Sequence, residues 1–275
     1  MAFQGIPVLN YHAIDNTGNM LPSRNVSVSL TAFKEQMEWL YNEGYKTVTD
    51  TELKALLIEG KSPTGKMVLI TFDDGYYSLY KYALEILSGY GFTATLFLST
   101  SFIGNPYEQG DFDFVKHDHQ LTWDEIKKLH AAGWSVQSHG YNHKRLNSLS
   151  VEEIIKEVTL SKSIIEQNLG TQVHSFAFPY GIYTNAVIQQ LKVAGYTFAY
   201  SVHSGKMFSR SNKFRLPRIE INNMDTMDSF KTKTLTGYIS KQHGARSKIR
   251  DIIYVNAALK DLIERWTPMF GFGNH

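Results

Sequence analysis

Short apolar runs alternate with longer amphipathic segments along most of this chain of 275 residues, and this alternation constrains its fold more than any other feature. The apolar run at residues 67–72 has the length of a strand and predicts a strand that is buried on both faces. Strands that alternate with helices indicate parallel βαβ units. Seven or eight such units favour a closed α/β barrel over an open sheet, and the chain is long enough for one, because such barrels need roughly 250 residues.

The expected elements follow one another in the order that a barrel requires. We predict strands at residues 6–10, 46–48, 67–72, 94–98, 134–137, 175–178, 198–202 and 215–219. We predict helices at residues 31–44 with Thr31 as N-cap, at 50–60, 79–87, 122–132 and 185–194, and in a long segment that begins at residue 150. Two of these helices begin with the pattern of a capping box, Thr122 with Glu125 and Ser150 with Glu153.

The alternation ends near residue 225, which suggests two parts of unequal size. We predict that residues 1–225 form the barrel and that residues 226–275 form a C-terminal extension packed on it. Within this extension we expect one helix, near residues 249–266.

The composition excludes several classes of protein and of site. The formal net charge is +2 and no Lys/Arg-rich run is present, so nothing indicates a nucleic-acid partner. The chain has no cysteine, so any metal would be bound by histidine and carboxylate side chains. No apolar run reaches the roughly 18 residues of a membrane span, and residues 1–7 lack the pattern of a signal peptide. Two locations therefore stay open: inside the cell, or outside it after removal of a leader.

Polar side chains gather at the carboxyl ends of the predicted strands. They are His12, the pair Asp73 and Asp74, His139, the segment at residues 179–181, His203 and Arg218. In a parallel barrel these strand ends share one face, and active sites form there. We interpret His203 as a possible substrate contact. The cluster at residues 117–119 lies away from a strand end, and we interpret it as a solvated loop.

Two carboxylates and two histidines suggest a metal site, although each pair has a simpler explanation. Asp73 and Asp74 behind an apolar strand are costly unless a cation neutralises them, and a metal could take one and leave the other as a base. Alone, however, Asp-Asp-Gly fits an ordinary turn better. His139 and His143 are four residues apart and can bind one ion if the segment turns helically, or they are surface or capping histidines. Two histidines and one aspartate suit Zn²⁺ or another divalent transition metal better than Ca²⁺ or Mg²⁺.

Together these motifs resemble those of the NodB-homology polysaccharide deacetylases, a family of carbohydrate esterases. The matching segments are residues 8–12, 71–75, 138–143, 176–181 and 216–219, and the resemblance covers about residues 6–221. It implies a distorted (β/α)7-type barrel. It also implies that Asp74, His139 and His143 bind the metal, that Asp73 is the general base, and that the backbone N–H of Tyr180 donates to the oxyanion.

The sequence departs from the common pattern of this family in two places. Residues 176–178 lack the Arg that many members carry there, and no late Leu-x-x-His motif is evident. One branch, similar to the poly-β-1,6-N-acetylglucosamine deacetylases, takes its catalytic acid from a histidine on the first strand and orients the base with a late arginine. His12 and Arg218 fit that order, so we predict His12 as the acid and Arg218 as the partner of Asp73.

The resemblance implies metal-dependent hydrolysis of N-acetyl groups from a polysaccharide that contains N-acetylglucosamine, with Zn²⁺ as the expected metal. We further expect a monomer that acts on a polysaccharide or oligosaccharide, outside the cell or at its surface. An acetyl-xylan-type esterase and a catalytically inactive carbohydrate-binding barrel remain alternatives, although the inactive form predicts damage at one of the key positions and none is evident. A metal-dependent isomerase or phosphoesterase would need more carboxylate ligands than the strand ends supply.

Overall fold

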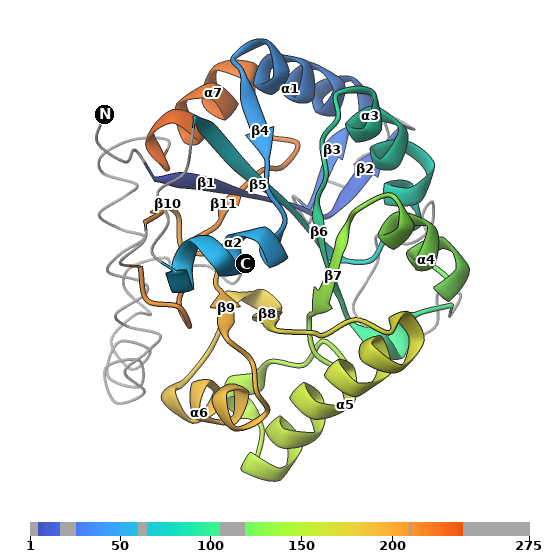
Figure 1. Cartoon of the computed structure of the whole chain (residues 1–275), viewed down its shortest axis with the longest axis vertical. Coiled ribbons are helices and arrows are strands. Elements are labelled where there is room, and N and C mark those ends of the chain that lie inside the picture. Colours follow the sequence, from blue (N-terminus) through green and yellow to red (C-terminus); the bar gives the residue numbers. More distant parts are fainter. Residues whose placement is uncertain (1–4, 17–25, 60–64, 105–118, 209–210, 239–275) are drawn as a thin grey trace, which may run out of the picture.

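A curled sheet of mostly parallel strands runs through the middle of the molecule, and helices cover its outer side (Figure 1). The structure is a computed structural model that describes residues 5–16, 26–59, 65–104, 119–208 and 211–238. The strands that line the sheet, in spatial order, are β1 (Ile6–Tyr11), β5 (Lys66–Asp74), β6 (Thr95–Leu98), β7 (Ser135–Ser138), β8 (Ser175–Ala177) and β9 (Phe198–Tyr200). Two further strands flank this path: β4 (Tyr45–Thr47) pairs with β5, and β10 (Lys206–Met207) runs antiparallel to β1.

One segment near the end of the described chain connects the two edges of the sheet. Leu216 forms a parallel bridge with Tyr200 of β9. Three residues later β11 (Ile219–Glu220) pairs in parallel with β1, with Ile219 opposite Leu9. The sheet therefore curls into a distorted barrel, and the expected fold is confirmed.

Apolar side chains fill the space on both sides of this sheet, and neighbouring residues of a strand take opposite sides. One buried cluster includes Val8, Leu69, Phe97 and Tyr200 from four strands, together with Leu53 from a helix. The other lies under the outer helices and includes Leu9, Ile70, Leu96, Phe176, Phe33, Leu129, Val158 and Leu191. Each such side chain contributes roughly 1.5–3 kcal/mol by its burial. The interior of the barrel is thus packed, which leaves its carboxyl-end mouth as the place for a site.

The outer helices lie close to their predicted positions, but one predicted cap differs. They are α1 (Leu30–Asn42), α3 (Leu84–Gly89), which continues a π-helical turn at Leu79–Ala83, α4 (Trp123–Ala131), α5 (Val151–Leu169) and α6 (Asn185–Val193). Both predicted capping boxes are present, at the starts of α4 and α5. The prediction of Thr31 as the cap of α1 was wrong. Ser29 is the cap, because its extended backbone lets its side chain accept from the N–H of Ala32 at 3.1 Å.

Helix α2 (Asp50–Glu59) lies over the middle of the ring of strands in Figure 1. Its first residue is fully buried beside the amino ends of the strands. Asp50 Oδ2 lies 2.7 Å from His174 Nε2, its other oxygen accepts from the Tyr200 hydroxyl, and its N–H donates to Thr95 Oγ1 at 2.9 Å. This buried polar cluster connects α2 to β6, to β9 and to the residue that precedes β8, and it occupies the end of the barrel opposite the predicted site.

Several elements were not predicted from the sequence. Strands β2 (Ala13–Asp15) and β3 (Ser27–Ser29) form a small parallel pair. Helix α7 (Met227–Thr236) packs on α1, where the rings of Phe230 and Trp39 lie 5.7 Å apart. The sequence of α7 has few apolar residues, so its helical pattern is weak. The helix expected near residues 249–266 lies outside the described residues, and the boundary at residue 225 stays a prediction. In the described part of the chain, no helix is long and apolar enough to cross a membrane.

Candidate active site

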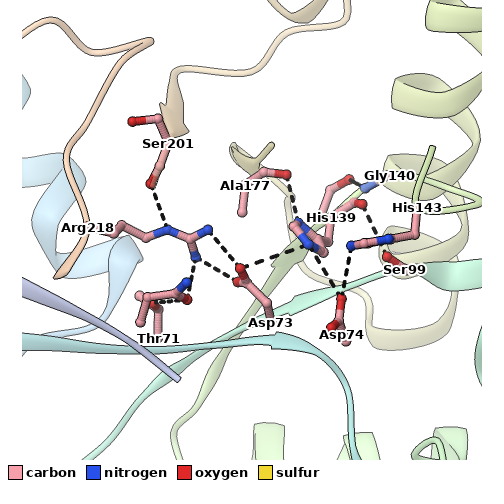
Figure 2. A network of polar contacts seen from close by, with 12 residues as sticks. Thr71, Asp73, Asp74, Ser99, His139, Gly140, His143, Ala177, Ser201 and Arg218 are labelled. Carbon is pink, nitrogen blue, oxygen red and sulfur yellow. Dashed lines mark hydrogen bonds and ion pairs between the residues drawn. The ribbon is translucent and has the colours of Figure 1, made fainter. Parts of the chain in front are cut away.

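Two adjacent carboxylates end the central strand β5 and point in different directions. Figure 2 shows Asp73 facing Arg218, and Asp74 facing His139 and His143. Both carboxylates are buried. Asp74 adopts a left-handed φ of 72°, and Gly75 after it has a φ of 86°, so the chain turns sharply as it leaves the strand. The two neighbouring carboxylates thus differ in their main partners but share His139, whose Nε2 lies 3.9 Å from Asp73 Oδ2 and 3.5 Å from Asp74 Oδ1.

Arg218 holds Asp73 with two parallel hydrogen bonds. Its Nη1 and Nη2 each donate to one carboxylate oxygen of Asp73 at 2.7 Å. The rest of the guanidinium is also used, since Nη1 donates to Asn10 Oδ1 at 2.9 Å and Nε donates to the Ser201 carbonyl at 3.1 Å. Arg218 is fully buried. A planar guanidinium held by this many hydrogen bonds fixes the position of the Asp73 carboxylate and also stabilises its negative charge.

Asp74, His139 and His143 form a compact buried cluster that could hold a metal ion. Asp74 Oδ1 lies 3.5 Å from His139 Nε2 and 3.3 Å from His143 Nε2. The three possible ligand atoms all lie within 4.8 Å of one another. Asp74 Oδ1 is buried and has no hydrogen-bond partner among the described residues. His139 Nδ1 lies 2.8 Å from the Ala177 carbonyl, which orients the ring and leaves Nε2 for the cluster. One oxygen and two imidazole nitrogens, buried and converging, fit a zinc-type ion.

Burial and neighbouring charges set the protonation of these groups. Burial lowers the pKa of both His139 and His143 to about 4, so each is neutral near pH 7, the form in which histidine binds a metal. Burial also raises the pKa of Asp74. Asp73 differs: burial opposes its ionisation, but the Arg218 guanidinium, with help from His139 and His12, lowers its pKa well below the usual range. Asp73 is therefore a firmly ionised carboxylate.

Backbone strain marks the same site. In the described part of the chain, the residues other than glycine with positive φ are Asp74, His143 and Tyr180, at 72°, 52° and 59°. Non-glycine residues rarely adopt this conformation, and such residues cluster at functional sites. Gly181 beside Tyr180 is required by space, because a Cβ there would lie 2.1 Å from Val202 Cγ2. Three separate loops thus hold a strained conformation around one mouth of the barrel.

The remaining predicted residues border this cluster. Tyr180 is 44% exposed, its ring centroid lies 4.7 Å from that of His143, and the Arg145 guanidinium lies 4.2 Å from its ring centroid. His12 directly follows β1, and its charge contributes to lowering the pKa of Asp73. Its Nδ1 is buried without a hydrogen-bond partner in the described part of the chain. His203 contacts Ser201, and its carbonyl accepts from the Arg218 N–H at 3.2 Å. His117 and Asp118 of the predicted solvated loop lie outside the described residues.

Comparison with known proteins identifies the family to which this architecture belongs. The family model described as polysaccharide deacetylase matches residues 60–199, about half of the chain. The chain belongs to the polysaccharide deacetylase family. The Bacillus subtilis protein YxkH, whose name assigns it to the polysaccharide deacetylases, is 30% identical over 217 residues, which cover 79% of this chain and 71% of that protein. The poly-β-1,6-N-acetyl-D-glucosamine N-deacetylase of Staphylococcus aureus is 27% identical over 234 residues, which cover 78% of each chain.

Solved structures share the fold of this polysaccharide deacetylase. The Streptococcus pyogenes deacetylase PplD, in complex with acetate, is 26% identical with a TM-score of 0.72, and the match covers 84% of this chain and 98% of PplD. IcaB from Ammonifex degensii is 23% identical with a TM-score of 0.68, and the match covers 84% of this chain and 95% of the IcaB chain. The sequence resemblance to the NodB-homology deacetylases is confirmed, and the protein is a polysaccharide deacetylase and a hydrolase.

Sequence reasoning missed several residues that support the site of this polysaccharide deacetylase. Asn10 and Ser201 bind the Arg218 guanidinium. Gln120, with its amide oriented to donate, bonds the carbonyl of Asp74 at 2.7 Å. Glu157 accepts from the loop between the two histidines. A charged residue on the apolar side of a helix, between Ile154 and Val158, was the one signal in the sequence that could have revealed Glu157.

Proposed function

We propose that this protein removes N-acetyl groups from a polysaccharide that contains N-acetylglucosamine, in a metal-dependent hydrolysis that releases acetate. One observation carries the proposal: a carboxylate held by Arg218 adjoins a buried Asp-His-His cluster of metal-ligand geometry. The name of the Staphylococcus aureus relative supports an amide bond and a polymer of N-acetylglucosamine as the substrate.

Asp74, His139 and His143 would hold the ion, and the donor set favours Zn²⁺. Such an ion acts as a Lewis acid, polarising a carbonyl oxygen and lowering the pKa of water. The protein supplies neutral imidazoles for this purpose, since burial lowers the pKa of both histidines to about 4. It also supplies rigidity, because the Ala177 carbonyl holds the ring of His139.

Asp73 is the general base in this proposal. It accepts a proton from the water that attacks the carbon of the acetyl carbonyl. A carboxylate with so low a pKa is a weak base, so its position matters more than its basicity. Arg218 fixes that position through two hydrogen bonds of 2.7 Å.

Tyr180 and His12 act on the oxygen and nitrogen of the substrate amide. The backbone N–H of Tyr180 donates to the carbonyl oxygen as negative charge develops on it. His12, in its imidazolium form, gives a proton to the nitrogen as the C–N bond breaks. The buried Nδ1 of His12, which lacks a partner among the described residues, supports a role in proton transfer. The products are acetate and a free amine on the sugar.

We also propose where the protein acts and in what form. Its substrate would be a polymer at the cell surface or outside the cell, and the protein would act there as a monomer. The donor set and the fold are compatible with β-1,6-linked and β-1,4-linked chains of N-acetylglucosamine alike.

Acetate release from N-acetylglucosamine oligomers tests the proposal. The protein is stripped of metal with a chelator, assayed with β-1,6-linked and β-1,4-linked oligomers, and assayed again after Zn²⁺ is added. We expect release that depends on Zn²⁺ and is abolished by Asp73→Asn. An O-acetylated xylan is the comparison substrate. Release from the xylan but not from the oligomers would replace the N-deacetylase with an esterase, and no release from either, with Zn²⁺ bound, would refute the catalytic role of the site.

A further inference from the structure

The loop that carries both histidines of the metal cluster is hydrogen-bonded to helix α5. Glu157 lies in the middle of this helix and is only 3% exposed. Its Oε2 accepts hydrogen bonds from two consecutive backbone N–H groups, those of Tyr141 at 2.9 Å and Asn142 at 2.8 Å. Both N–H groups lie between His139 and His143. One carboxylate oxygen therefore sets the path of the chain from the first histidine to the second.

The loop is shaped to receive this carboxylate. Gly140 has a φ of 87°, and a Cβ at that position would lie 3.3 Å from Glu157 Oε2, which is closer than most real Cβ contacts. His143 follows with a left-handed φ of 52°, a conformation that must be imposed by its surroundings. The glycine admits the carboxylate, and the two hydrogen bonds hold the turn that leads to His143.

The opposite side of the loop is bonded to the segment that follows β6. The N–H of Thr100 donates to the Gly140 carbonyl at 3.2 Å, and that of Ser101 donates to the Tyr141 carbonyl at 2.9 Å. The carbonyl groups of the loop therefore accept from the segment that follows β6, which includes the Ser99 hydroxyl at 3.2 Å from the His139 carbonyl, whereas two of its N–H groups donate to Glu157. Of these contacts, the one with Glu157 is made by a carboxylate side chain.

A buried carboxylate is a costly way to satisfy two backbone N–H groups, because ionised groups lose their hydration when they are buried. A negative charge behind two histidines, however, favours a cation in front of them, and partners of metal-binding residues tune both ligand position and affinity. We propose that Glu157 is a positioning residue for the metal site, which acts through His139 and His143. This inference rests on the proposed function, because it requires that the cluster binds a metal.

Helix α5 also provides a matched control. Glu166 lies on the same helix, and its Oε1 likewise accepts from a backbone N–H, that of Val173 at 3.0 Å, and from Lys162 at 2.8 Å. These contacts connect α5 to the segment before β8 instead of to the histidine loop. Glu166 is partly exposed and accepts from one backbone N–H, so Glu166→Gln removes a carboxylate and a backbone contact from the same helix without touching the metal cluster.

The test compares the Zn²⁺ affinity of the full chain, of Glu157→Gln and of Glu166→Gln, by competition with a chromophoric chelator. We expect Glu157→Gln to weaken Zn²⁺ binding roughly ten- to a hundredfold, and Glu166→Gln to leave it unchanged. Added Zn²⁺ should restore the kcat of acetate release in Glu157→Gln with little change in KM, an effect that a purely structural role would not produce. Gly140→Ala is the second variant, because it disturbs the same contact from the loop side and should weaken Zn²⁺ binding as well.

The possible results separate this inference from the proposed function. Equal Zn²⁺ affinity in the unaltered protein and in folded Glu157→Gln would overturn the positioning role while leaving the metal site intact. If Glu157→Gln does not fold, unchanged affinity in Gly140→Ala would overturn it in the same way. Failure of the unaltered protein to bind Zn²⁺ would instead overturn the metal site itself, and the positioning role with it.

Discussion

The pair formed by Asp73 and Arg218 leads to the sharpest prediction, because its charges are buried and its geometry is well defined. Replacing Arg218 with Met removes two hydrogen bonds of 2.7 Å and leaves the Asp73 carboxylate buried without its counter-ion. Breaking a buried ion pair in this way costs about 3–5 kcal/mol. For a chain approaching this size each kcal/mol corresponds to roughly 2–4 °C in Tm, so the variant should melt roughly 10 °C lower near neutral pH.

The size of this loss should depend on pH, and its sign follows from the two pKa values of Asp73. In the unaltered protein the folded-state pKa of Asp73 is far below its pKa in the unfolded chain. Ionised Asp73 therefore stabilises the fold in full at any pH above the unfolded-state pKa. Without Arg218, burial dominates and raises the folded-state pKa above the unfolded value. The variant should then regain stability as the pH falls through this raised pKa and Asp73 takes up a proton.

Thermal unfolding of both proteins, in chelator and at several pH values between about 7 and 4, measures the effect. The difference in Tm should narrow as the pH falls. Arg215→Met is the control. Arg215 lies in the same segment but is partly exposed. In the described structure its guanidinium donates one hydrogen bond, to Asn185 Oδ1 at 3.0 Å. A Tm difference for Arg218→Met that stays constant across this range would refute the idea that a buried, unpaired Asp73 causes the loss.

Three further predictions concern the catalytic groups and the metal. Asp73→Asn should abolish acetate release while its Zn²⁺ affinity stays within a few-fold of that of the unaltered protein, whereas His139→Ala should lose both acetate release and Zn²⁺ binding. A similar loss of Zn²⁺ affinity in the two variants, measured by chelator competition, would contradict their separate roles. His12→Gln should keep Zn²⁺ and lower kcat by roughly a hundredfold or more, the usual contribution of a general acid; an unchanged kcat would assign the acid elsewhere. The metal-free protein should lose stability as the pH falls from about 6.5 to about 4, because His139 and His143 have a folded-state pKa of about 4 and the unfolded chain binds more protons in that window. Replacing both histidines with glutamine should flatten this slope in thermal melts.

Local patterns in the sequence predicted most of the elements, and the failures have physical reasons. The apolar run at residues 67–72 became β5, because a strand covered on both faces has to be apolar throughout its length. The capping boxes at Thr122 and Ser150 formed because they depend only on residues within one turn. Helix α7 was missed because its stability depends on packing against α1, through Phe230 and Trp39, and not on its own pattern.

The candidate site divides in the same way. Residues that follow a strand directly, such as Asp74 and His139, could be assigned to one mouth of the barrel, because the carboxyl ends of parallel strands meet there. Arg218 could be paired with Asp73 only through a family resemblance, since 145 positions separate them. The position of Glu157 between Ile154 and Val158 indicated a buried acid, but nothing in the sequence identified the loop whose N–H groups it binds.

The sequence by itself therefore determined the order of the main strands and helices of the barrel, its class, and the chemical types available at its mouth. These properties depend on interactions between residues close in the chain, which a pattern of apolar and polar residues records directly. Only the tertiary structure decided which groups touch, for instance that Asp73 is bound by Arg218 and that the histidine loop rests on Glu157. Such contacts depend on the curl of the sheet and the packing of α5 against it, which set distances of a few ångströms between residues far apart in sequence.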